Sequence, residues 1–94
     1  MHQYEVTYIV QPDIEENGLE EILTKVQGWI TDSGGKVEKV DRWGKKKLAY
    51  IIRKYKEGTY FLLHSEMEPT FCHELERNLK LLEPVIRSMI IKVD

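Results

Sequence analysis

The chain has 94 residues, of which 41% are hydrophobic and 32% are charged, and its formal net charge at pH 7 is −2. A chain of this length can bury one hydrophobic core, and this composition is that of a globular domain, which excludes intrinsic disorder. The single cysteine, Cys72, excludes an internal disulfide, and no apolar run approaches the roughly 18 residues that span a bilayer. With no signal-peptide pattern at its start, the sequence predicts one cytoplasmic domain over residues 1–94, without membrane association.

The first third of the chain predicts a strand and a helix. Hydrophobic residues alternate over residues 4–10, a period of two that is typical of a strand with one buried face. Pro12 and Asp13 end this strand, and Asp13 can cap the helix that follows. Acidic residues crowd toward the start of that helix, where they suit its dipole, and Gly34 and Gly35 end it. Its apolar face has helical spacing and consists of Leu19, Ile22, Leu23, Val26 and Ile30.

The middle of the chain predicts a long hairpin. Residues 36–53 are strand-like, with a break in alternation between Val37 and Val40 and a bulge at Gly44. We expect a charged turn at residues 54–58, followed by a third strand from Tyr60 to about Met67.

The last third predicts a second helix and a fourth strand. Pro69 and Thr70 open the helix, with Thr70 as its cap, and Pro84 ends it. Residues 85–93 form the strand, in which Arg87 interrupts the apolar face that carries Val85 and Met89. The core-facing residues of the helix are Phe71, Leu75, Leu79 and Leu82.

The element order is therefore βαββαβ. With right-handed crossovers this order predicts an α+β, ferredoxin-like sandwich in which a four-stranded antiparallel sheet carries two helices on one face. Enzymes, metal chaperones, regulatory modules and RNA binders share this fold, so function has to be inferred from the site.

Catalytic and metal-binding sites find little support in the sequence. A loop that binds the phosphate of a substrate for hydrolysis needs N–H donors. The first loop, residues 11–13, has a carboxylate at Asp13 and no backbone N–H at Pro12. The three histidines and Cys72 match no recurring zinc spacing. Residues 56–61 only loosely imitate the motif that stacks bases in the RNA-recognition fold. We expect no enzymatic activity, no cofactor, no metal and no small-molecule substrate.

Positive charge in residues 36–56 is the strongest functional indication. This segment holds nine lysines and arginines against two acids, a charge of +7, whereas the rest holds five bases and 14 acids, a charge of −9. One-signed charge interleaved with aromatic residues is typical of a surface that binds a phosphate backbone. Two alternatives stay open: lysines that protect an edge strand from aggregation, and a regulatory or interaction module for another polyanion or a protein. A membrane is less favoured, because the bases do not lie on an amphipathic helix.

The segment WGKKKLAYIIRK, residues 43–54, resembles the hallmark of the bacterial small-subunit ribosomal protein six family, and the likeness covers nearly the whole chain. The resemblance implies a structural role in the ribosome, cytoplasmic or organellar. It implies binding to the central domain of small-subunit ribosomal RNA together with small-subunit ribosomal protein eighteen. Ile51 stands where many family members have proline, so we expect a more regular strand here.

Two sets of residues are expected to make these contacts. Each set includes residues that have another explanation. Trp43 and Tyr50 can instead pack within the fold, and Arg87 can instead lie at the sheet edge with its charge in solvent. The expected RNA contacts are Arg42, Lys45, Lys46, Lys47, Arg53, Lys54, Arg87 and Lys92. The residues expected to contact either RNA or the protein partner are His2, Tyr4, Trp43 and Tyr50.

Overall fold

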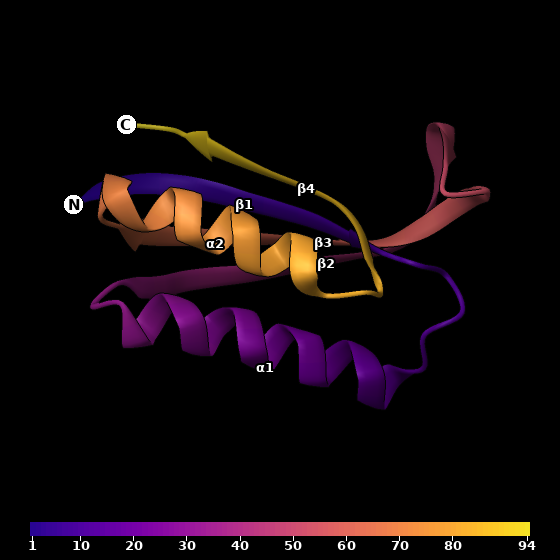
Figure 1. The fold of residues 1–94 in the computed structure, drawn as a ribbon, viewed down its shortest axis with the longest axis horizontal. Coiled ribbons are helices and arrows are strands. Elements are labelled where there is room, and N and C mark those ends of the chain that lie inside the picture. Colours follow the sequence, from indigo (N-terminus) through magenta and orange to yellow (C-terminus); the bar gives the residue numbers. More distant parts are fainter.

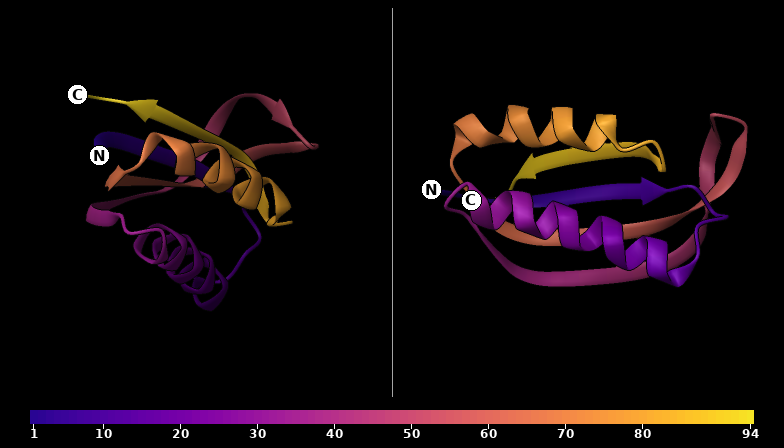
Figure 2. Two further views of the ribbon diagram at one scale, coloured as in Figure 1. Left: turned by 60° about the vertical axis from the view of Figure 1, so that its left-hand side comes forward. Right: turned by 60° about the horizontal axis from the view of Figure 1, so that its bottom comes forward.

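The computed structural model describes residues 1–94, and its elements follow the order βαββαβ (Figure 1). The elements are β1 (His2–Val10), α1 (Glu16–Asp32), β2 (Lys36–Ile52), β3 (Tyr55–Met67), α2 (Pro69–Leu81) and β4 (Val85–Lys92). The strands form one antiparallel sheet in the order β2-β3-β1-β4. Both helices lie on the same face of this sheet (Figure 2). The predicted ferredoxin-like architecture is confirmed. No helix combines the length and apolar character that crossing a membrane requires.

The core lies between the sheet and the two helices. Alternate residues of β1 and β3 face the helices, and the ring of Tyr8 stacks on that of Phe61 with centroids 5.1 Å apart. All five apolar residues predicted for the first helix are buried, whereas the second helix buries Leu75 and Leu79 and leaves Phe71 and Leu82 partly covered. Full burial of one such side chain is worth about 1.5–3 kcal/mol, so these residues fix the position of each helix on the sheet.

The turn between β2 and β3 differs from the prediction. Instead of a charged turn at residues 54–58, two residues, Arg53 and Lys54, connect the strands with φ angles of 47° and 65°. Successive residues with positive φ form a tight hairpin turn whose twist suits its flanking strands. Arginine and lysine seldom adopt this conformation, so no local pattern indicates this turn. Gly58, which suggested the turn, lies inside β3.

Two glycines shape the hairpin where it leaves the sheet. Gly44 has a φ of 79°, and the register shifts between Arg42 and Gly44, which confirms the predicted bulge. A Cβ added at Gly58 would lie 2.4 Å from Cγ2 of Ile9. Pairing between β1 and β3 ends at Thr59, so residues 47–57, here called the hairpin arm, continue without a β1 neighbour. The arm projects past the end of β1 and turns toward the β4 side (Figures 1 and 2).

The helix starts and the buried face of the fourth strand also differ from the prediction. Neither Asp13 nor Thr70 caps a helix: Glu15 precedes α1 and Glu68 precedes α2, and neither side chain makes a capping hydrogen bond. Pro69 takes the first helical position, which suits its fixed φ and missing N–H. Val85 is buried, unlike Met89 and the residues beyond it, because the register shifts next to the end of β1.

Ser65 is a site where the fold can be stabilised. Its side chain is 1% exposed, and its hydroxyl, like that of Tyr8, is buried without a hydrogen-bond partner. A buried unsatisfied hydroxyl costs about 1–3 kcal/mol. We therefore expect Ser65→Ala to raise the free energy of unfolding in urea by about 0.5–2 kcal/mol. A lower free energy of unfolding in the alanine variant would show instead that the hydroxyl is hydrogen-bonded in the folded protein.

Candidate nucleic-acid interface

The sheet face opposite the helices, here called the open face, carries apolar and charged side chains together. Cross-strand register places His64 beside Glu5 and places Arg87 beside Ile9. Along the edge strand β4, Met89 is 51% exposed and Ile91 is 45% exposed. Exposed apolar groups gathered on one face are typical of a surface that binds a partner.

An apolar hollow of about 230 Å³ lies where the hairpin arm meets the open face. Arg87 borders it, with its guanidinium 5.4 Å from the ring centroid of Tyr50 and donating a hydrogen bond to the Tyr50 hydroxyl. These contacts hold Tyr50 as part of the wall, although more than half of its surface stays exposed. The lining residues are Thr7, Ile9, Leu48, Ala49, Tyr50, Ile52, Tyr60, Arg87, Ser88 and Met89.

The lysine triplet, Lys45, Lys46 and Lys47, lies next to this hollow. All three side chains are exposed and none makes an ion pair, so their charge is available to an anion. The ammonium of Lys46 lies 5.7 Å from the ring centroid of Trp43, and the Trp43 ring stacks on Tyr60 with centroids 6.2 Å apart. Because Tyr60 also lines the hollow, the basic surface and the apolar surface are continuous.

Arg42 is placed differently from the other predicted contacts. Its guanidinium makes ion pairs of 2.7 Å with Glu16 and 2.8 Å with Glu20 on α1, and it lies 5.1 Å from the ring centroid of Phe61. These contacts tie β2 to α1 on the helix side of the sheet, and two carboxylates already compensate the charge. RNA binding by Arg42 stays a prediction that this geometry does not favour.

Four of the remaining predicted contacts lie on β1, on β4 and in the turn of the arm. Tyr4 belongs to the core and is 8% exposed, so little of its ring could touch RNA. His2, at the start of β1, has its Nδ1 3.6 Å from a carboxylate oxygen of Asp94. Lys92 ends β4, and Lys54 belongs to the tight turn of the arm; both are exposed and make no ion pair.

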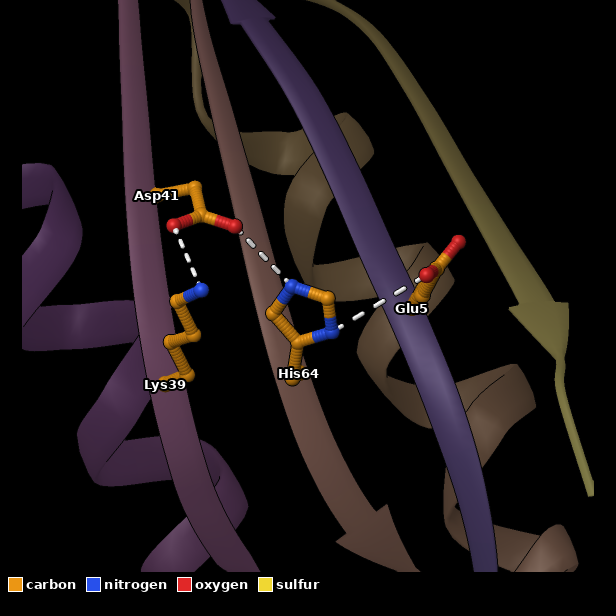
Figure 3. A network of polar contacts seen from close by, with 4 residues as sticks. All are labelled: Glu5, Lys39, Asp41 and His64. Carbon is orange, nitrogen blue, oxygen red and sulfur yellow. Dashed lines mark hydrogen bonds and ion pairs between the residues drawn. The ribbon is translucent and has the colours of Figure 1, made fainter.

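A polar network crosses the open face from β2 to β1 (Figure 3). His64 Nε2 lies 3.0 Å from Asp41 Oδ2, and His64 Nδ1 lies 3.9 Å from Glu5 Oε2. Because an ionised carboxylate only accepts, the ring nitrogen that faces Asp41 must donate. This hydrogen bond from His64, together with Lys39 Nζ at 3.6 Å, lowers the pKa of Asp41 below its ordinary value. From the sequence, His64 was considered only within a histidine set that matches no zinc spacing. The network was not predicted, because it depends on strand register.

The lowered pKa of Asp41 predicts how stability responds to acid. In the unfolded chain the carboxyl regains its ordinary pKa of about 3.9, so folding is favoured above that pH, and this contribution is lost as the pH falls through the folded pKa. We expect Asp41→Asn to show a smaller drop in the free energy of unfolding between pH 7 and about pH 3 than the parent protein, measured in urea. Asp13→Asn, at an exposed position without an ion pair, is the control; equal pH dependence in both variants would contradict the prediction.

Fold and site together define a ferredoxin-like domain in which an exposed sheet face adjoins a strand rich in lysine and arginine. No group of three or more metal-ligating side chains comes together in it. The family model described as ribosomal protein S6 matches residues 3–92, and the chain belongs to this family. The resemblance inferred from residues 43–54 is thereby confirmed. Membership makes the chain a ribosomal protein of structural, non-enzymatic type.

Relatives and solved structures agree with this assignment. The small ribosomal subunit protein bS6 of Moorella thermoacetica is 43% identical over 94 residues, which cover 100% of this chain and 96% of that protein. The bS6 protein of Heliobacterium modesticaldum is 39% identical, with 100% and 98% covered. The crystal structure of 30S ribosomal protein S6 from Thermotoga maritima has a TM-score of 0.92 at 29% identity, covering 98% of this chain and 87% of that one.

Proposed function

We propose that this chain binds the central domain of small-subunit ribosomal RNA together with small-subunit ribosomal protein eighteen. The observation that carries the proposal is the continuity of two surfaces of different chemistry through Tyr60, which stacks on Trp43 and lines the apolar hollow. One surface suits a polyanion and the other suits a protein. A protein that docks at a junction of RNA and protein needs both surfaces side by side.

RNA binding is supported by the lysine triplet. Its exposed ammonium groups have no carboxylate partner within ion-pair distance, so an incoming phosphate does not have to displace one. Each phosphate that a lysine neutralises releases counterions, which favours binding without reading the base sequence. The half-exposed ring of Trp43 beneath Lys46 adds a flat surface on which a base or a ribose can pack.

Binding of a protein partner is supported by the open face. The hollow beneath the arm and the exposed side chains of Met89 and Ile91 form an apolar region on one side of the sheet. Interfaces between proteins have cores of this kind, surrounded by polar groups. Glu5, Asp41 and His64 supply such a polar border on the neighbouring strands.

The proposal is tested by measuring binding to a central-domain RNA fragment with and without small-subunit ribosomal protein eighteen, at two salt concentrations. We expect tight binding that weakens with salt and that requires or is strengthened by the partner. The absence of binding in every combination would contradict the proposal and favour an interaction module for another polyanion or protein.

A further inference from the structure

A second basic region lies at the opposite edge of the sheet from the lysine triplet, beside β4. A hollow of about 310 Å³ is bordered there by Arg53 from the turn of the arm, Lys80 near the end of α2, and Arg87 on β4. Ser88 adds a hydroxyl, and Leu79 and Val85 form part of an apolar floor. Basic residues from the turn of the arm, from α2 and from β4 thus line this hollow, and no carboxylate does.

The two arginines are held in place by contacts that use only part of their donor sets. Arg53 Nη1 donates a 3.0 Å hydrogen bond to the carbonyl oxygen of Glu83, and Arg87 Nη1 donates to the hydroxyl of Tyr50. A guanidinium has five N–H donors in a rigid fork, so each arginine keeps donors for a further acceptor.

Lys80 is the only one of the three cations with an ion pair. Its Nζ lies 3.4 Å from a carboxylate oxygen of Glu76, one helical turn away, and both side chains are mostly exposed. An exposed pair of this spacing contributes only about 0.3–0.5 kcal/mol, so a stronger acceptor can displace it. The hollow thus combines two guanidinium groups held by hydrogen bonds with one ammonium that makes only a weak, exposed ion pair.

We propose that this hollow binds a phosphate group of the RNA backbone, a site that rests on the proposed function. A tetrahedral oxyanion can accept from two guanidinium forks, an ammonium and a hydroxyl at once, which matches the side chains present. Bound there, it would relieve the repulsion among the three cations, which no carboxylate of the lining compensates.

An RNA backbone fits the arrangement better than a free phosphate ion. Lys46 and Arg53 lie on the same strand and turn, seven residues apart, which is at most about 23 Å of extended chain. A free phosphate ion offers a single group, whereas one RNA segment carries successive phosphates that can contact the lysine triplet and the hollow at β4 together. The hairpin arm would then lie along the RNA, with positive charge at its base and at its turn.

The test measures RNA affinity for Lys80→Gln, Arg53→Gln and the double variant, with small-subunit ribosomal protein eighteen present. Each single change is expected to weaken binding about three- to tenfold at 0.1 M salt and to reduce the slope of log K against log salt by about 0.7–0.9. If both residues hold one phosphate, the double variant should lose less than the product of the two single losses. Lys25→Gln, exposed on α1 and away from the hollow, is the charge-matched control and should stay within twofold.

The outcomes separate this site from the proposed function itself. Unchanged affinity in Lys80→Gln and Arg53→Gln, with strong binding by the parent protein, would overturn the β4 site and leave the proposed function standing. No RNA binding by the parent protein would overturn both. Titration with inorganic phosphate, followed through the side-chain Nε–H signals of Arg53 and Arg87, identifies the ligand. Phosphate-dependent shifts without any loss of RNA affinity in the variants would assign the hollow to a free anion and contradict the proposal.

Discussion

Replacement of Lys45, Lys46 and Lys47 by glutamine is expected to weaken binding to central-domain RNA by roughly two orders of magnitude or more at 0.1 M salt. Each phosphate contact with a duplex contributes about −0.9 to the slope of log K against log salt, so losing three contacts should flatten this slope by about 2–3. The three ammonium groups carry no ion pair in the free protein, so their full charge is available for these contacts.

Binding of the triple variant should be measured at several salt concentrations beside a control in which Lys25 and Arg77 on the helices become glutamine. The triple variant should keep the unfolding free energy of the parent to within about 1 kcal/mol, since exposed substitutions away from packed groups change stability little. A parallel salt dependence for the triple variant and the parent would remove the lysine triplet from the RNA interface.

The second large effect concerns Gly58, where Gly58→Ala is expected to lower the free energy of unfolding by about 1–3 kcal/mol. Its added Cβ would lie 2.4 Å from Cγ2 of Ile9 and 3.1 Å from the carbonyl oxygen of Val10, so β1 and β3 would have to move apart. These contacts lie where the arm leaves the sheet, so the strain should change the orientation of the arm relative to the sheet. We therefore also expect weaker binding to RNA.

Gly28→Ala is the matched control for this substitution. Gly28 lies inside α1, and an added Cβ would meet no atom within 4 Å, so the better helix propensity of alanine should raise the free energy of unfolding by about 0.5–1 kcal/mol. Urea unfolding of both variants gives the comparison. Equal stability of Gly58→Ala and the parent protein would show that Ile9 can turn aside at little cost.

The local periodicity of the chain was enough to predict the fold. The apolar residues of the first helix, the break near Val37 and the bulge at Gly44 are properties of short segments, and the structure has them all. Conformation set by tertiary contacts was not predictable in this way. The buried position of Gly58 depends on how the hairpin passes the end of β1, and the positive φ of Arg53 and Lys54 depends on the pairing of β2 with β3, which leaves only two residues for the turn.

In the candidate site too, features of short segments were predictable from the sequence, whereas tertiary contacts were not. Clustering of exposed lysines follows directly from three consecutive residues on an edge strand, so the sequence located the basic surface. The partners of Arg42 lie 22 and 26 residues earlier in the chain, and those of His64 lie on two other strands. Such contacts depend on packing and register, as does the meeting of Lys80 with Arg53 and Arg87 at one hollow.

The polarised charge of the molecule affects how fast and in which orientation it meets a polyanion. Residues 36–56 carry +7 and the remainder −9, and residues 13–32, which include α1 on one face of the sheet, carry −5 of that negative charge. Such a molecule has a large electric dipole moment, so the field of a polyanion turns it during diffusion, attracting the hairpin arm and repelling α1. Electrostatic steering of this kind raises the association rate at low salt while leaving the dissociation rate to the close contacts. Most encounters then begin in the orientation that docking requires.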